Sequence, residues 1–169
     1  MDEPVPIPPG PGQESVWDYP RPPRLEPTSK RLVVEHAGHV VADTTRAMRV
    51  LETSQAPAYY LPEADIDMEL LRPATARSFC EWKGTASYGD LVVATPDGEV
   101  VVANAAWTYL HPVEAYAGLV GHWAFFAQSV DRCLVDGEQA RPMDGGVYGG
   151  WVTDDIVGPI KGGPGSATW

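Results

Sequence analysis

The chain has 169 residues, a length that suits one compact domain. Acidic residues outnumber basic ones by 23 to 12, and the resulting net charge of −11 argues against broad contact with nucleic acid or anionic membranes, which needs clustered Lys and Arg. The 17 glycines and 17 prolines are too many for a helical bundle, whereas a hydrophobic fraction of 44% allows a packed core. There is no apolar run near the roughly 20 residues that span a bilayer, and no basic, apolar leader. We therefore expect a soluble, cytoplasmic protein.

The first 14 residues are rich in proline and glycine and show no hydrophobic period. We expect them to be a flexible or polyproline-like lead-in, followed by a single domain over residues 15–169. That domain begins with an arm that carries Trp17 and Tyr19. A fully solvated tail would rarely keep such side chains, so the arm should lie across the domain surface, where it could also mediate a protein interaction.

Short strands are expected from residue 30 onward. Apolar residues on both sides of Ala37-Gly38 predict a hairpin, and the dipeptides Asp97-Gly98 and Asp136-Gly137 predict tight turns. Residues 42–50 are the best helix candidate, and residues 112–118 predict one helical turn. Strands are expected over residues 32–34, 40–42, 48–53, 58–61, 79–88, 90–94, 100–109, 120–127 and 133–135. The pattern predicts a mainly β fold of antiparallel sheets with short helical turns.

The glycine-rich stretch from Gly145 to Gly165 keeps large apolar side chains, among them Tyr148 and Trp151. A linker would not keep them, so this stretch is expected to be an ordered, irregular strap packed on the sheet. It is not a phosphate loop, because the strand–GxxxxGK[ST]–helix order is missing.

Cysteine and histidine spacing gives no support for a metal site. A zinc site closed by protein alone needs about four such ligands, usually in paired spacing, and Cys80 and Cys133 form no CxxC pair. His36 and His39 flank a turn and are expected to be exposed. We expect no metal and no cofactor, since the glycine fingerprint of dinucleotide binding is also missing. Both cysteines should be reduced, small, buried side chains.

Several motifs together resemble the bacterial domain-of-unknown-function family 427. They are VWDYPRPP (16–23), VVADTTRAMRVLETS (40–54), YYLP (59–62), SFCEWKGTASY (78–88), AWTY (106–109), GHWAFF (121–126), CLVDGE (133–138) and GGWVT (149–153). The resemblance implies a small β domain similar to the β-tent fold of methionine sulfoxide reductase B and of the ligand-binding domain of cereblon. Many such relatives hold zinc with two CxxC pairs, which this chain lacks, so the zinc is not carried over. The composition, rich in Arg, Ala, Gly, Val and Pro, points to an actinobacterial genome.

Three positions depart from the usual pattern of that family. Gln55 stands where His is common, Gly89 where Trp is common, and Leu110 where Pro is usual. If these positions line a pocket, the resemblance implies a roomier and less basic one here.

The central motif holds the residues most suited to chemistry. Alternation along a strand would place Glu81 and Lys83 on one face, about 6.5–7 Å apart. Such a pair can transfer protons or hold an anion, although it can equally be a surface salt bridge of little energetic value. Lys83 is one of three lysines, lies within an aromatic segment, and is the last cation before residues 84–131, which contain no Lys or Arg.

Strand alternation extends this pair to a candidate pocket. The candidate catalytic residues are Lys83 as general acid, anion anchor or amine nucleophile, Glu81 as base, and Tyr109 and His122 as hydrogen-bond partners. The candidate ligand-binding residues are Glu52, Tyr59, Tyr60, Trp82 and Trp107. The competing interpretation makes the aromatic residues and His122 ordinary core.

Two functions follow from this pocket. The first is a small-molecule-handling protein, such as a cofactor-independent enzyme that uses a Glu/Lys/Tyr pocket for acid–base chemistry or anion anchoring. The alternative is a non-catalytic ligand- or peptide-binding module with an aromatic cage built from Trp82, Trp107 or Trp123. The expected partner is a small molecule, anionic if Lys83 anchors it, and neither nucleic acid nor a membrane. The oligomeric state stays open, a homodimer included.

Overall fold

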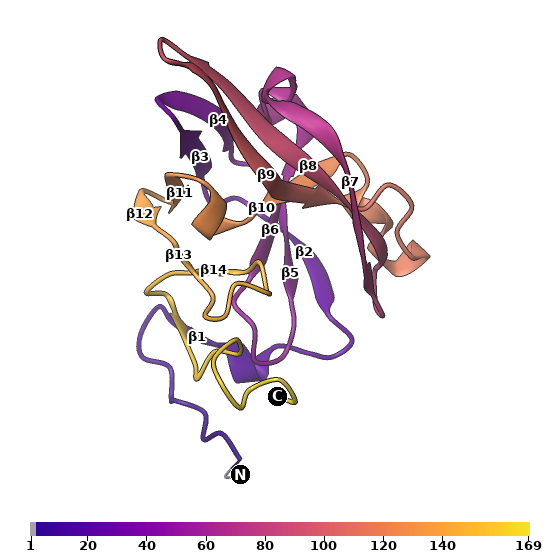
Figure 1. The fold of residues 1–169 in the computed structure, drawn as a ribbon. Helices are drawn as coiled ribbons and strands as arrows, with labels where there is room; N and C mark the ends of the chain where they lie inside the picture. Colours follow the sequence, from indigo (N-terminus) through magenta and orange to yellow (C-terminus); the bar gives the residue numbers. More distant parts are fainter. Residues whose placement is uncertain (1–2) are drawn as a thin grey trace.

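A curled antiparallel sheet of seven strands forms the frame of the molecule in the computed structural model, which describes residues 3–169 (Figure 1). In spatial order its strands are β2 (Arg24–Thr28), β5 (Ala47–Leu51), β6 (Ala58–Pro62), β10 (His122–Phe125), β9 (Gly98–Thr108), β8 (Gly84–Thr95) and β7 (Leu71–Cys80). A four-stranded antiparallel sheet consists of β12 (Glu138–Gln139), β11 (Arg132–Val135), β3 (Leu32–His36) and β4 (His39–Thr44). The prediction of a mainly β fold of antiparallel sheets is therefore confirmed.

Short elements complete the fold. The pair β1 (Glu14–Ser15) and β15 (Ile156–Val157) is parallel, and the pair β13 (Arg141–Pro142) and β14 (Trp151–Val152) is antiparallel. Five 3-10 helices are present in the described residues: η1 (Val16–Asp18), η2 (Glu63–Asp65), η3 (Met68–Leu70), η4 (Glu114–Leu119) and η5 (Ala127–Ser129). The predicted helical turn near residue 114 is thus confirmed. None of the helices described in residues 3–169 is long and apolar enough to cross a membrane.

The predicted hairpin turns are confirmed at two places where a glycine has positive φ. His36 pairs with His39, and Ala37 and Gly38 both have positive φ, as a tight two-residue hairpin turn requires. The Asp136-Gly137 turn between β11 and β12 has the same signature. The predicted helix over residues 42–50 is wrong, because this segment ends β4 and begins β5. Residues of this segment pair with neighbouring strands, and the β-branched Thr44 and Thr45 favour extended structure.

The expectation of a continuous strand over residues 79–88 is also wrong. Cys80 ends β7 and pairs with Gly84, which begins β8, so residues 81–83 form the turn of a hairpin. Gly84 has φ of 104°, a conformation that glycine adopts without the clash of a Cβ. The expectation that Glu81 and Lys83 share one face of a strand is therefore wrong, because both belong to the turn in which the chain reverses direction.

Side-chain alternation on the seven-stranded sheet separates two hydrophobic clusters. Tyr59 and Phe125 face the main core, which also contains Trp151 and residues of the four-stranded sheet. Their neighbours Tyr60 and Ala124 face the opposite side, where they join Trp107 in a second cluster. This second face of the sheet carries the cavity described below.

The chain ends pack against each other beside the large sheet (Figure 1). In the N-terminal arm, Val16 and Tyr19 are buried, and Trp17 Nε1 donates to the Pro159 carbonyl oxygen at 2.8 Å. In the C-terminal strap, Trp151 is buried and its Nε1 donates to the Phe125 carbonyl oxygen at 2.8 Å. The strap is irregular and packed on the sheet, as predicted.

Candidate functional site

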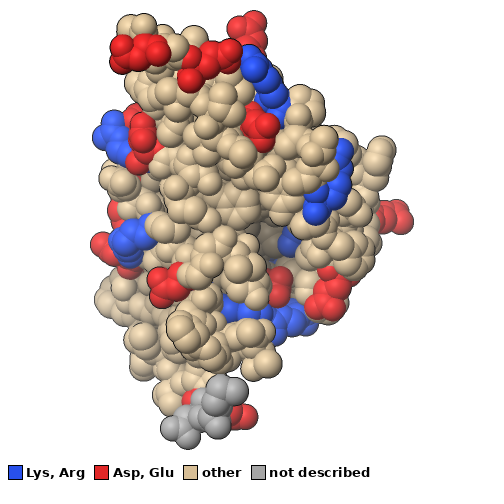
Figure 2. Space-filling model, viewed as in Figure 1, with Lys and Arg blue, Asp and Glu red and all other residues tan. Residues whose placement is uncertain are grey.

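A cavity of about 460 Å³ opens on the second face of the seven-stranded sheet. The hollow is visible in Figure 2, with a basic side chain inside it and acidic side chains around its rim. Strands β6, β8 and β9 supply its floor, the β7–β8 turn forms one wall, and residues 147–150 of the strap form another. Segments far apart in the sequence therefore build this cavity.

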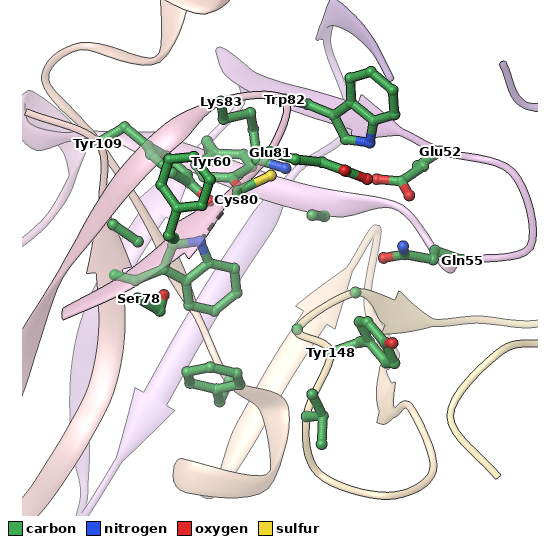
Figure 3. A pocket seen from close by; sticks show the side chains of 18 of the residues that line it. Glu52, Gln55, Tyr60, Ser78, Cys80, Glu81, Trp82, Lys83, Tyr109 and Tyr148 are labelled. Atoms are coloured by element: carbon green, nitrogen blue, oxygen red, sulfur yellow. Dashed lines mark hydrogen bonds between the residues drawn. The ribbon is translucent and has the colours of Figure 1, made fainter. Parts of the chain in front are cut away.

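Aromatic side chains make up the floor. Trp107 Nε1 donates a hydrogen bond of 3.2 Å to the Tyr60 hydroxyl oxygen, and the ring centroids of Trp107 and Phe126 lie 4.5 Å apart. Tyr60 and Tyr109 lie 6.3 Å apart between ring centroids (Figure 3). Burial raises the pKa of both Tyr60 and Tyr109, so both phenols are neutral near pH 7. The floor therefore offers flat apolar surface together with neutral hydroxyl groups.

Lys83 is the basic group at the turn, and its side chain is buried with 8% of its surface exposed. Its carbonyl oxygen accepts a bond of 2.9 Å from the Val113 amide, which fixes the turn. The ammonium lies next to the Cys80 thiol and 5.7 Å from the centroid of the Tyr109 ring (Figure 3). Among residues 3–169, no carboxylate forms an ion pair with it.

The charge state of Lys83 follows from its surroundings. Burial opposes the charged form, but attraction from the side chains of Tyr60, Cys80 and Glu52 outweighs burial and raises the pKa of this amine above its usual value. Lys83 is therefore a cation at neutral pH.

Two carboxylates stand near the mouth of the cavity. Glu52 follows β5 and pairs with Arg21, whose Nε lies 3.3 Å from Oε2. Glu81 is exposed at the tip of the β7–β8 turn. In Figure 3 their carboxylates point toward one another, with Gln55 on the same side of the cavity. Glu81 and Lys83 thus both line the cavity, although not through the strand geometry that predicted their proximity.

The other predicted residues divide into two groups. Trp82, Trp107, Tyr60, Tyr109 and Glu52 line the cavity together with Lys83 and Glu81. Tyr59 instead packs against Trp151 in the main core, with 5.4 Å between ring centroids. His122 lies outside the cavity, with Nδ1 3.0 Å from the Val120 carbonyl oxygen, and Trp123 Nε1 donates to Glu63 at 3.0 Å. The structure therefore does not bring His122, Tyr59 or Trp123 to the site.

The cavity residues that sequence reasoning missed include Cys80, Tyr148 and Lys161. Lys161 belongs to the strap, its side chain is 8% exposed, and its Nζ lies 5.0 Å from the centroid of the Tyr148 ring. The rarity of lysine, which drew attention to Lys83, applies equally to Lys161. It could have been found by the same argument, because the strap was expected to be ordered.

The cysteines and the possible metal ligands fall in different places. Both cysteines are free; Cys80 is half-buried at the cavity, whereas Cys133 is in the main core, where burial raises its pKa to about 12. Within residues 3–169 there is no group of three or more His, Cys, Asp or Glu side chains arranged to hold a metal ion. Of the three unusual positions, Gln55 lines the cavity, while Gly89 packs against Trp123 and Leu110 is exposed.

Comparison with known proteins places the cavity in a family context. No curated protein matches the chain. The model of a family described as a domain of unknown function (DUF427) matches residues 24–136, which run from β2 to β11 and the turn after it. The matched range contains Lys83 and the aromatic floor, whereas residues 147–150 and Lys161 lie beyond it. Because this match covers more than half of its length, the chain belongs to the DUF427 family.

Proposed function

We propose that the protein binds a small anionic molecule in the cavity, with the Lys83 ammonium as its anchor. The observation that carries the proposal is a buried cation that faces a cavity and has no carboxylate partner among residues 3–169. Neighbouring side chains offset the burial of this charge, but no carboxylate among residues 3–169 forms an ion pair with it, so an anion that enters the cavity can contact the ammonium directly. The aromatic floor would pack against the apolar part of the same molecule.

The charge state of Lys83 narrows its chemical role. A lysine that acts as an amine nucleophile must be deprotonated, and the raised pKa of Lys83 works against this at neutral pH. We therefore assign Lys83 the role of anion anchor or general acid. In an enzyme of this design, the carboxylates of Glu81 and Glu52 are the available bases, and the phenols of Tyr60 and Tyr109 are hydrogen-bond donors.

A non-catalytic binding module is the second candidate function. It is favoured by the aromatic walls, because Trp82 and Trp107 both line the cavity. An aromatic cage typically holds a cation, but the two lysines on the cavity walls oppose a cationic ligand. We therefore expect such a module to bind the same anionic class, and product analysis after incubation would separate it from an enzyme.

We further propose that the protein works in the bacterial cytoplasm. Support comes from the free thiols of Cys80 and Cys133, which suit a reducing compartment. The composition of the chain supports a bacterial source.

The proposed function is tested by calorimetric titration of benzoate, with benzamide as a neutral molecule of the same shape. We expect benzoate to bind and benzamide not to bind. Lys83→Met should weaken benzoate binding by about 10- to 150-fold, the range that corresponds to a hydrogen bond with a charged group. Lys30→Met is the matched control, because Lys30 pairs with Asp155 away from the cavity.

The fold of each variant is checked by its denaturation midpoint. Methionine has nearly the length of lysine, so Lys83→Met should keep the wild-type fold. Wild-type affinity for benzoate in a folded Lys83→Met protein would overturn the proposal, as would equal affinities of the wild type for benzoate and benzamide.

A further inference from the structure

We infer that Cys80 is a nucleophile and that the anion bound at Lys83 is a 2-oxo carboxylate, whose carbonyl carbon adds the Cys80 sulfur reversibly. The inference rests on the proposed function and makes the ligand class narrower. The chain has two cysteines, and they differ in their access to a ligand. Cys133 lies in the main core with 1% of its surface exposed, whereas Cys80 is half-buried and lines the cavity.

The β7–β8 hairpin places the Cys80 thiol beside the Lys83 ammonium. Cys80 pairs with Gly84 at the base of the turn that residues 81–83 form. The Lys83 carbonyl oxygen accepts from the Val113 amide at 2.9 Å, which holds this turn in place. The sulfur and the side-chain nitrogen are neighbours in Figure 3, and both residues line the cavity. A ligand in the cavity can therefore contact the two groups at once.

The surroundings of Cys80 are typical of a reactive cysteine. The thiolate is the nucleophilic form, and reactive cysteines occupy partly exposed sites beside a cation. Lys83 supplies the cation, with 8% of its surface exposed and no carboxylate paired with it in the described part of the chain. An ammonium has three N–H donors, so it can face the sulfur and hold an acid group of the ligand together.

The substrate class follows from the closeness of the sulfur and the ammonium. A carboxylate held by the ammonium brings the carbon attached to it close to Sγ of Cys80, whereas a carbon several bonds further away would be carried past the thiol. The electrophilic carbon must therefore be the one next to the carboxylate. In a 2-oxo acid this carbon belongs to a ketone or aldehyde, and thiols add to such carbonyl groups reversibly.

The reaction is an addition, so it needs no oxidant, reductant or leaving group. A bond forms between Sγ and the carbonyl carbon, the π bond of the carbonyl breaks, and its electron pair moves to the oxygen. The thiol proton passes to that oxygen through solvent, which gives a hemithioketal, and the reverse steps release the 2-oxo acid. The neutral phenols of Tyr60 and Tyr109 line the cavity near the thiol, where they can donate hydrogen bonds to the developing oxyanion.

The test compares phenylglyoxylate with mandelate, which has the same carbon skeleton but carries CH–OH where phenylglyoxylate carries C=O. Mandelate can use the Lys83 anchor but cannot accept a nucleophile. We expect the wild type to bind phenylglyoxylate about 10-fold or more tightly than mandelate in calorimetric titrations. Cys80→Ala should remove this preference and leave mandelate affinity within about twofold, because mandelate forms no bond to sulfur.

A spectroscopic signature separates bond formation from a merely structural role of Cys80. With phenylglyoxylate labelled with ¹³C at the ketone carbon, the bound signal should move from the ketone region to that of a tetrahedral carbon. Cys80→Ala should leave the bound signal in the ketone region. Cys133→Ala is the matched control, since Cys133 lies in the main core, and it should behave as the wild type. Denaturation midpoints confirm that each variant is folded.

The possible results separate the inference from the proposed function. If benzoate and mandelate bind through Lys83 but bound phenylglyoxylate keeps its ketone signal, the inference is wrong and the proposed function stands. The same conclusion follows if a folded Cys80→Ala protein keeps the full preference for phenylglyoxylate. If none of these acids binds the wild type, the proposed function fails, and the inference fails with it.

Discussion

Gly149 is the point where the strap comes closest to the aromatic floor of the cavity. A Cβ built on this residue would lie 2.1 Å from Cη2 of Trp107 and within 3 Å of two further indole carbons. Ordinary contact begins at 3.4 Å. In Gly149→Ala, the strap and the indole must therefore separate by more than 1 Å.

The indole has little freedom to move. Trp107 is 7% exposed, donates to Tyr60, and packs against Phe126. The strap is equally confined, because a Cβ on the next residue, Gly150, would meet the Ala56 carbonyl oxygen at 2.2 Å. Adding a methyl group to a well-packed site costs about 1–3 kcal/mol. Since neither partner can yield, we expect Gly149→Ala to lose about 2–3 kcal/mol of unfolding free energy.

Urea denaturation followed by tryptophan fluorescence measures this loss. Gly163→Ala is the matched control in the same strap, since its Cβ would meet only the Asp144 carboxylate oxygen at 3.9 Å. We expect the control to stay within about 0.5 kcal/mol of the wild type. A Gly149→Ala protein as stable as the control would refute the close packing of strap and indole, and with it the position of this wall of the cavity.

Two further predictions concern titratable groups. Iodoacetamide should alkylate Cys80 in the folded protein and spare Cys133, because Cys133 is 1% exposed and burial raises its pKa to about 12. Peptide mass spectrometry measures the labelling, and equal labelling of the two cysteines would contradict this reasoning. Hydrogen bonds from Arg46 and Thr44 lower the pKa of Asp65 from 3.8 to about 2. Because the folded value is below the unfolded one, this carboxylate stabilises the fold above about pH 4 and loses its effect as the pH falls towards 2. Asp65→Asn should slightly flatten the dependence of the unfolding free energy on pH; the effect is small because solvent screens the pair of Asp65 and Arg46. An acid-unfolding curve identical to that of the wild type would contradict the lowered pKa of Asp65.

Local sequence signals predicted the parts of the fold that local chemistry determines. The turns at Ala37-Gly38 and Asp136-Gly137 were predictable because each places a glycine where the backbone needs positive φ. The turn at residues 81–83 was not, since Glu81, Trp82 and Lys83 are not typical turn residues. Their alternation of polar and apolar types imitates a strand that continues into β8.

The candidate site shows more clearly what the alternation of side chains along a strand cannot predict. Tyr59 and Tyr60 are adjacent and identical in type, so only the register of β6 against β5 decides which one faces the cavity. His122 shares its strand parity with Ala124 on the cavity side, yet it lies at the start of β10 opposite Pro62. Alternation along a strand predicts which face of the sheet a side chain occupies, but not how far along the strand it lies from the cavity.

The convergence of Lys83 and Lys161 depends on contacts between distant segments. Seventy-eight positions separate them (161 − 83), and no periodicity connects a hairpin turn with a glycine-rich strap. Their placement at one cavity requires the strap to approach Trp107 at Gly149 and the β7–β8 turn to fold toward the same face. The sequence could identify each lysine as unusual, but only the tertiary fold brings both to one cavity.

The net charge of −11 and an anionic ligand are compatible because the two act over different distances. At physiological ionic strength charges are screened beyond about 8 Å, so carboxylates spread over the surface contribute little inside the cavity. In the proposed function, the buried Lys83 acts on the anion at contact distance and in a less polar medium, where its charge has a larger effect. In the proposed function, the acidic surface disfavours loose, non-specific binding of anions, while the cavity favours an anion that reaches Lys83. An acidic protein with a few buried cations is in this way more selective for its anion than a basic protein, which attracts anions over its whole surface.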